Sequence, residues 1–128
     1  MWSDAMPKSD RRRYSGVKGK RMIVNNIFEN LSDLDLSDEY IEKIFEGENV
    51  YVERIVSKAH CTKPGEWLKQ ELNEWVIVLS GRAVLSFEGE PDVKLKSGDY
   101  IFIPAHKLHR VKETSSEPNC VWLTFFFK

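Results

Sequence analysis

The sequence feature that most constrains the fold is a series of short segments in which apolar and polar residues alternate. Alternation with a period of two is typical of β-strands, because successive side chains point to opposite faces of a sheet. Turn residues such as Pro64-Gly65 and Gly98-Asp99 separate the segments. The predicted strands lie at residues 50–58, 74–79, 82–88, 92–97, 100–104, 108–112 and 119–127. Strands at spacings of about eight to twelve residues predict an all-β sandwich or barrel.

Other segments before and between these strands carry weaker patterns. Residues 26–31 predict a first short strand. Residues 38–47 stay open between two structures, because their apolar spacing fits a helix while their β-branched and aromatic content fits a strand. Residues 60–66 predict a loop, and Ser80-Gly81 predicts a two-residue hairpin.

The length of 128 residues indicates a single domain. Residues 1–21 hold seven basic and two acidic residues without hydrophobic periodicity, so we predict that they form a disordered tail. A basic arm that binds nucleic acid or acidic lipid is the alternative interpretation of this segment. The folded domain is expected to comprise residues 22–128, which carry twelve basic and eighteen acidic residues. This acidic domain argues against nucleic acid as a partner.

Hydropathy and cysteine content indicate where the protein resides. No apolar run reaches the roughly 20 residues that a membrane-spanning helix needs. Residues 1–16 also lack the apolar stretch of a signal peptide. The two cysteines, Cys61 and Cys120, predict reduced thiols in a chain without a secretion signal. We therefore expect a cytoplasmic protein with no membrane partner.

Two segments of the chain resemble the two sequence motifs of the cupin superfamily. Glu74, the six residues WVIVLS and Gly81 match the second half of the first motif. Gly98, the five residues DYIFI, Pro104 and His109 follow the spacing of the second motif. From about residue 26 to residue 128 the chain is similar to short single-domain bacterial cupins. The resemblance implies one antiparallel jelly-roll (cupin) β-barrel, a fold that hosts many chemistries.

The chain departs from these motifs at three positions. Leu68 and Gln70 occupy the positions of the His-x-His pair of the first motif, and His106 stands where the family usually has Gly. An amide oxygen is a weaker ligand for a transition metal than imidazole. Gln70 is therefore either a weak metal ligand or a residue that orients a substrate by hydrogen bonding. Leu68 favours a site without metal, because an apolar residue takes a ligand position.

Glu74 and His109 are the leading candidates for site residues. Glu74 is separated from Val76 and Val78 by even numbers of residues, so in a strand all three side chains point to the same face. If the valines face the interior of the barrel, Glu74 faces it too. A carboxylate there is costly unless it is paired or coordinated. The resemblance implies that His109 is an inward-facing ligand, and neutral imidazole binds many divalent metals. The alternatives are a salt-bridged glutamate at the barrel mouth and a surface or capping histidine.

Four more residues near the motifs are candidates for additional ligands or for the pocket wall, namely His60, His106, Trp67 and Leu68. His60 ends a predicted strand and matches a histidine of the related short cupins, so it either supplies a missing imidazole or has a structural role. His106 either joins the site or hydrogen-bonds within its own loop. Trp67 is a candidate because ligand pockets are predominantly apolar.

These observations lead to two functional hypotheses. In the first, Glu74, His109 and Gln70 hold a divalent transition metal (Zn, Mn, Fe or Ni) beside a small organic ligand, with dioxygenase, isomerase or lyase chemistry. In the second, the barrel binds a small molecule without a metal and without catalysis. Neither hypothesis assigns a catalytic residue.

The last predicted strand points to self-association. Residues 119–127 are apolar on both faces, so one face is expected in the core and the other against a second sheet or subunit. The resemblance implies the same, since cupins commonly dimerise. We therefore predict a homodimer.

Overall fold

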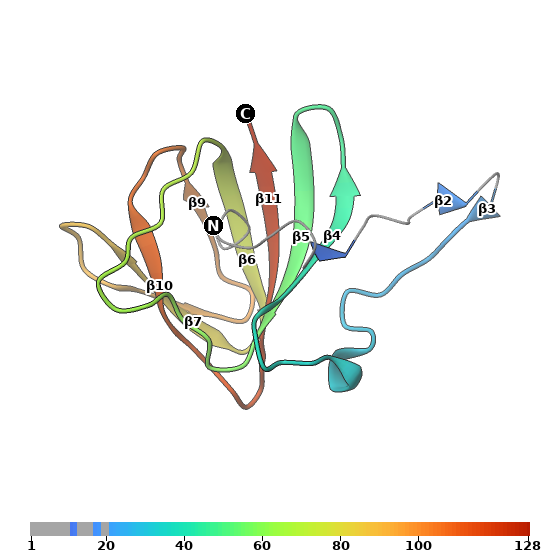
Figure 1. Ribbon diagram of the computed structural model, residues 1–128, viewed down its shortest axis with the longest axis horizontal. Coiled ribbons are helices and arrows are strands. Elements are labelled where there is room, and N and C mark those ends of the chain that lie inside the picture. Colours follow the sequence, from blue (N-terminus) through green and yellow to red (C-terminus); the bar gives the residue numbers. More distant parts are fainter. Residues whose placement is uncertain (1–10, 13–16, 19–20) are drawn as a thin grey trace.

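Two β-sheets face each other across one core (Figure 1). The computed structural model describes residues 11–12, 17–18 and 21–128. The larger sheet has the strand order β1-β4-β5-β11-β6-β9, and the smaller sheet has the order β10-β7-β8. The elements are β1 Arg11–Arg12, β2 Val17–Lys18, β3 Arg21–Met22, the 3-10 helix η3 Leu31–Asp33, β4 Tyr40–Glu46, β5 Val50–Ser57, β6 Asn73–Ser80, β7 Arg82–Phe87, β8 Val93–Lys96, β9 Tyr100–Ile103, β10 His109–Thr114 and β11 Cys120–Phe127. This architecture confirms the predicted all-β barrel.

The first three strands are two residues long and precede the barrel segments. β1 pairs in parallel with β4 at the edge of the larger sheet, and β2 pairs with β3 in a separate two-stranded sheet. That small sheet lies away from the two large ones (Figure 1). The predicted disordered tail, residues 1–21, falls mostly outside the described residues.

Each strand that the alternation predicted from residue 50 onward is present, as β5 to β11. The segment 38–47, which the sequence left open between helix and strand, contains β4 at Tyr40–Glu46. The pairing of β4 with β5 shifts register between Lys43 and Phe45. Such a bulge changes which side chains share a face, and it explains why the segment lacks a clean period of two.

The predicted strand at residues 26–31 is wrong, because this segment forms a turn that leads into η3. The backbone oxygen of Asn26 accepts a hydrogen bond from the nitrogen of Glu29 at 3.0 Å, and Asn30 has a φ of +58°. Asparagine favours such turns because its side chain bonds its own backbone and tolerates a positive φ. Arg54 of β5 holds the turn in place by donating to the carbonyl oxygen of Glu29 at 2.9 Å.

The predicted hairpin at Ser80-Gly81 is also wrong, because the two strands that it joins belong to different sheets. β6 pairs with β11 and β9, whereas β7 pairs with β10 and β8. The chain turns at Gly81, whose φ is +81°, and crosses from the larger sheet to the smaller one. A Cβ atom at Gly81 would lie 2.6 Å from the backbone oxygen of Asn119. Glycine permits both this backbone angle and this close approach.

The cross-strand register divides the interior face of the larger sheet into an apolar part and a polar part. Residues that pair directly on antiparallel strands point to the same face. The rows across β5, β11 and β6 are Ile55–Trp122–Val78, Glu53–Thr124–Val76 and Tyr51–Phe126–Glu74. The first row belongs to the fully buried apolar core. The other two rows bring two carboxylates and a hydroxyl into the interior.

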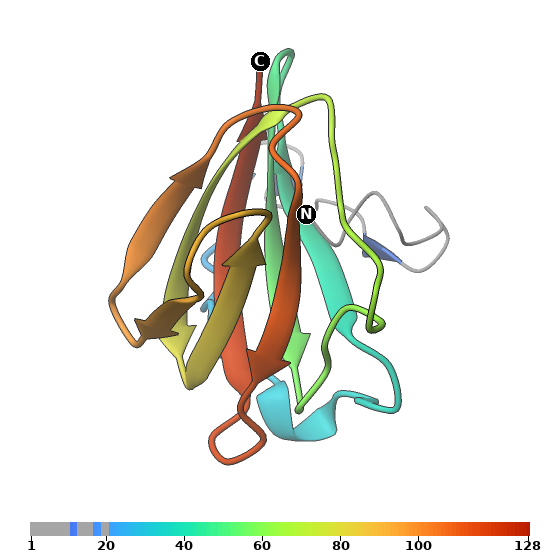
Figure 2. The same ribbon diagram turned by 90° about the vertical axis from the view of Figure 1, so that its left-hand side faces the viewer.

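The segment between β5 and β6 runs along β10 of the smaller sheet (Figure 2). Thr62 and Val111 exchange two hydrogen bonds, and the backbones of Leu68 and His109 exchange two more, at 2.7 and 3.1 Å. The predicted loop at residues 60–66 is therefore confirmed as irregular chain that is nevertheless held in place. Its course carries Leu68 and Gln70 to the polar end of the barrel.

The outer face of the larger sheet carries partly exposed aromatic side chains. We call this surface the aromatic face, and it comprises Trp75, Tyr100, Phe102, Phe125 and Phe127. The Trp75 ring centroid lies 5.2 Å from that of Tyr100 and 5.5 Å from that of Phe125. Tyr100 is 65% exposed and Phe102 is 50% exposed. One face of β11 thus lies in the core, and the other contributes to this surface.

Candidate functional site

The candidate site is a group of buried polar residues at the polar end of the interior. We call it the interior cluster, and it comprises Gln70, Glu74, His109 and Thr124. The Glu74 carboxylate is fully buried, as the parity of β6 predicted. It accepts two hydrogen bonds, one from Gln70 Nε2 to Oε1 at 2.9 Å and one from Thr124 Oγ1 to Oε2 at 2.8 Å. Two donors fix the orientation of the carboxylate, which prepares it to bind a further group.

His109 enters the interior from β10 of the smaller sheet and is fully buried. Its Nδ1 lies 2.7 Å from the carbonyl oxygen of Lys107. A carbonyl oxygen can only accept, so Nδ1 carries the proton and Nε2 of the neutral ring is an acceptor. The backbone bonds to Leu68 hold the histidine in register, and the Phe87 ring centroid lies 6.3 Å from the imidazole centroid.

Gln70 provides an acceptor that no described residue satisfies. Its side chain is 5% exposed, and Nε2 is directed to the Glu74 carboxylate. The amide oxygen Oε1 is buried and has no hydrogen-bond partner within the described residues. A buried polar atom without a partner costs about 1–3 kcal/mol. The orientation of Gln70 therefore leaves Oε1, within the described residues, as an acceptor that can receive a hydrogen bond.

The structure does not bring the other two histidines to the interior cluster. His60 Nδ1 accepts a hydrogen bond from the backbone nitrogen of Lys58 at 2.9 Å, within its own turn. His106 is exposed and has a φ of +68°. That backbone angle favours glycine, which explains why the second cupin motif usually carries Gly at the position of His106. Leu68 is partly buried against the core, and Trp67 is 40% exposed.

The side chains of the interior cluster do not fit a metal site with three strong protein ligands. Within the described part of the chain, no three His, Cys, Asp or Glu side chains are grouped so that they could hold one metal ion. Glu74 and His109 are the two such residues in the interior cluster, and Leu68 contributes no donor. Gln70 also turns its NH2 group, not its oxygen, toward Glu74. These contacts suit a hydrogen-bonded organic ligand better than a transition metal.

Two interior residues were missed by the sequence reasoning, Thr124 and Glu53. Both are fully buried and face each other across β11 and β5. The signal for Glu53 was present, because it shares the parity of Tyr51 and Ile55 within the alternating segment 50–58. Thr124 could not be recognised without the register, which places it two residue pairs from Glu74 on the same face of the sheet.

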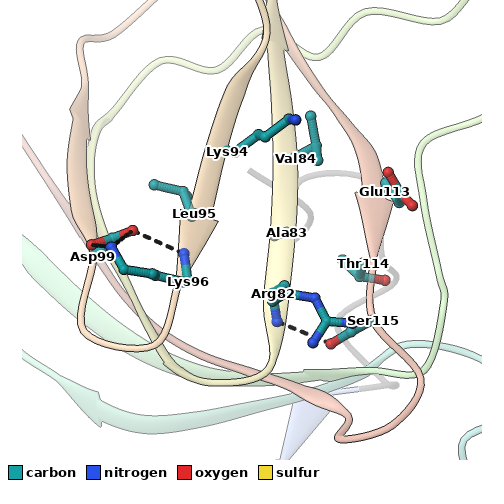
Figure 3. Close-up of a pocket in the computed structure, with 10 residues that line it drawn as sticks. All are labelled: Arg82, Ala83, Val84, Lys94, Leu95, Lys96, Asp99, Glu113, Thr114 and Ser115. Carbon is teal, nitrogen blue, oxygen red and sulfur yellow. Dashed lines mark hydrogen bonds and ion pairs between the residues drawn. The ribbon is translucent and has the colours of Figure 1, made fainter.

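A separate hollow of about 450 Å³ lies on the smaller sheet (Figure 3). It is lined by Arg82, Ala83, Val84, Lys94, Leu95, Lys96, Asp99, Glu113, Thr114 and Ser115. None of the site residues predicted from the sequence lies among them. Part of its charge is already neutralised, since Lys96 Nζ lies 3.3 Å from an Asp99 carboxylate oxygen. We therefore place the candidate site in the barrel interior.

No helix within the described residues has the length and apolar character needed to cross a membrane.

Comparison with known proteins identifies relatives of this chain. The family model described as the cupin domain matches residues 58–126. A proposed mannose-6-phosphate isomerase from Ralstonia eutropha JMP134 is similar in structure, with a TM-score of 0.78 and 31% identity over 83% of this chain and 98% of that one. No curated protein matches this chain.

Two more distant structures share the fold. A cupin superfamily protein from Desulfitobacterium hafniense DCB-2 has a TM-score of 0.66 and 15% identity, covering 90% of this chain and 97% of its own. An RmlC-like cupin from Methanocaldococcus jannaschii, with a double-stranded β-helix fold, has a TM-score of 0.62 and 15% identity, covering 82% and 92%.

Proposed function

Because this chain belongs to the cupin family, we propose that it binds a small organic molecule in the barrel interior through the interior cluster, without a metal ion. The observation that carries this proposal is the buried Gln70 Oε1, which lacks a hydrogen-bond donor within the described residues. Glu74 and His109 add oriented acceptors on both sides of the same interior. A few placed polar groups in an apolar enclosure are typical of small-molecule sites.

The first functional hypothesis from the sequence, a divalent metal on Glu74, His109 and Gln70, is the rival of this proposal. The orientation of the Gln70 amide and the leucine at position 68 favour the metal-free alternative. Elemental analysis of untagged protein purified without chelator distinguishes the two. We expect no stoichiometric Zn, Mn, Fe or Ni, and no change of melting temperature when these ions are added.

The activity proposed for the Ralstonia relative does not extend readily to this chain. A sugar phosphate is an anion, and phosphate sites in proteins commonly supply Arg, Lys or backbone N–H donors. The described residues of the two polar interior rows instead include the carboxylates Glu53 and Glu74. We therefore propose binding, and we leave mannose 6-phosphate outside the proposed ligands.

A ligand screen on the full chain tests the binding proposal. In the presence of chelator, at least one small organic molecule is expected to raise the stability of the protein, by about 2.7 kcal/mol at a hundredfold excess over its Kd. Replacing Gln70 with leucine removes the acceptor, so the variant is expected to fold and to lose most of this stabilisation. Thermal melting and calorimetric titration provide the measurement.

The matched control for this screen is Glu113→Gln, which changes an exposed residue on the smaller sheet. It should leave ligand binding unchanged. A broad screen without any melting shift would contradict the proposal. Stoichiometric metal that is lost from Glu74→Ala and His109→Ala would instead establish the metal-binding alternative.

The aromatic face carries a second proposal, that two copies of this chain associate through it. A contiguous aromatic surface on a sheet is costly in water and typical of an interface. Phe102 and Phe127 continue the surface beyond Trp75, with ring centroids 6.2 Å apart. The same strand, β11, supplies both the core residue Phe126 and the surface residue Phe125.

Replacing Phe102 with glutamate is expected to convert the proposed dimer into a monomer. A buried charge at the centre of an interface weakens association by at least about 2 kcal/mol, or roughly thirtyfold. Light scattering at several concentrations measures the mass of the parent and the variant. Lys94→Glu, which lies on the other sheet, is the control and should remain dimeric. A parent protein that stays monomeric at high concentration would refute the proposal.

A further inference from the structure

The hollow on the smaller sheet gathers basic side chains on its outward face. Arg82 of β7 and Lys94 and Lys96 of β8 are exposed and line it (Figure 3). Their strand neighbours Ala83 and Leu95 are buried in the core. Because successive side chains of a strand point to opposite faces, the three basic side chains point away from the barrel interior.

The strand register sets two of these positive charges directly opposite each other. Arg82 pairs with Lys96, and Lys94 lies two residues away on β8, opposite Val84. Like charges at directly opposite positions destabilise a sheet. An anion bound in the hollow would offset this repulsion.

Within the described residues, only Lys96 of the three bases has an acidic partner. Its Nζ lies 3.3 Å from each carboxylate oxygen of Asp99, which also accepts a hydrogen bond from the backbone nitrogen of Lys96 at 2.9 Å. The guanidinium of Arg82 and the ammonium of Lys94 form no ion pair with a described residue. These two groups are therefore available to an anionic ligand.

The second acid of the hollow, Glu113, restricts the charge of that ligand. It lies on β10 opposite Val84, and thus across β7 from Lys94. With three bases and two acids, the lining carries a net charge of +1. One carboxylate neutralises this charge. A phosphate ester carries about −1.5 to −2 at pH 7 and would leave excess negative charge beside Glu113.

The hollow also has the size and the surface for a small organic molecule. Its volume of about 450 Å³ falls within the range of about 300–1,000 Å³ that is usual for ligand pockets. Val84, on the central strand of the three, adds a partly buried apolar surface. An arginine guanidinium can bind a carboxylate through two parallel N–H···O hydrogen bonds, and a lysine ammonium adds a compact positive charge.

We propose that the hollow is a second binding site, for a small organic carboxylate. Arg82 and Lys94 hold the carboxylate, and the apolar part of the ligand covers Val84. The site is independent of the proposed function, because no residue of the interior cluster lines it.

Three probes of one shape measure the charge preference on the full chain. Benzoate, benzamide and benzamidine carry a negative charge, no charge and a positive charge. We expect benzoate to bind about tenfold or more tightly than the other two in calorimetric titration, and to shift the NMR signals of the Val84 methyl groups. Arg82→Gln should weaken benzoate binding by about tenfold or more. Added salt should weaken it as well, because the charges are exposed.

The matched control is Lys112→Gln. It removes the same charge from an exposed lysine of the same sheet that lies outside the hollow, where Lys112 pairs with Asp92. Benzoate binding should not change. Gln70→Leu should also leave it unchanged, which separates this site from the interior cluster.

Each outcome decides the proposal. Equal binding of the three probes, or tighter binding of benzamidine, overturns it, and so does the absence of benzoate binding at millimolar concentrations. Benzoate binding that survives the double replacement Arg82→Gln and Lys94→Gln overturns it too. If that binding is lost in Gln70→Leu instead, the carboxylate belongs to the interior cluster and the proposed function stands alone. Phenyl phosphate that binds more tightly than benzoate overturns the carboxylate class.

Discussion

Replacing Gly81 with alanine is expected to destabilise the protein by about 2–5 kcal/mol. Two costs add at this position. The φ of +81° is strained for any residue with a Cβ atom. The new methyl group would also lie 2.6 Å from the backbone oxygen of Asn119 and 2.9 Å from Cys120 Cα. Backbone atoms cannot rotate away as a flexible side chain can, so the crossing between the two sheets has to shift. Urea unfolding of the full chain, followed by tryptophan fluorescence, measures the loss.

Gly89→Ala is the matched control, because it isolates the backbone angle from the close approach. Gly89 has a φ of +76°, but nothing lies within 4 Å of a Cβ atom built there. The strain alone is expected to cost about 1–2 kcal/mol. Equal losses of unfolding free energy in the two variants would show that the close approach to residues 119 and 120 does not contribute to the destabilisation.

Gly81 also shows where sequence reasoning about the fold reached its limit. Alternation predicted the strands from β5 to β11, because the period of two is a local property of each strand. The sheet to which a strand belongs depends on long-range pairing, so a hairpin and a crossover at Ser80-Gly81 have the same local sequence. The segment 26–31 failed for a related reason. Its apolar residues fit a short strand, but no strand among the described residues pairs with it, and its asparagines favour a turn.

Sequence reasoning predicted those site residues whose signal lies within a single strand or a single motif. Parity with Val76 and Val78 placed Glu74 inside, and the resemblance to the second motif indicated His109. The contacts that define the chemistry join different strands. Thr124 reaches Glu74 across β11 and β6, and Gln70 reaches it from a loop. No pattern within one segment contains these pairs.

The two ends of the barrel interior carry different buried polar residues. The polar end carries the interior cluster, beside Phe126 near the end of β11. The opposite end, where β11 begins at Cys120, carries Glu39 and Ser57, whose Oγ donates to Glu39 Oε2 at 3.2 Å. Burial, together with the nearby charge of Glu39, raises the pKa of the Cys120 thiol, so this thiol stays neutral and packs as a core residue.

Replacing Glu39 with glutamine is expected to remove a large pH dependence of stability. Burial raises the pKa of Glu39 from 4.5 to about 8, the charges of Glu53 and Asp38 add to the rise, and the Ser57 hydrogen bond opposes it. Between these two pKa values the folded state keeps a proton that the unfolded state has lost. The contribution of Glu39 to stability is therefore largest below pH 4.5, falls as the pH rises toward 8, and then levels off. This one residue contributes a loss of about 2–4 kcal/mol.

Glutamine keeps the shape and cannot ionise, so the variant should equal the parent near pH 4.5 and exceed it in stability above pH 8. Urea unfolding of both proteins across this range gives the difference directly, and other titrating groups cancel from it. Glu113→Gln, at an exposed position, should show no such divergence. A parent and a Glu39→Gln variant whose free energies of unfolding run parallel with pH would mean that Glu39 is ionised in the fold. The Ser57 end of the barrel would then have to stabilise a carboxylate.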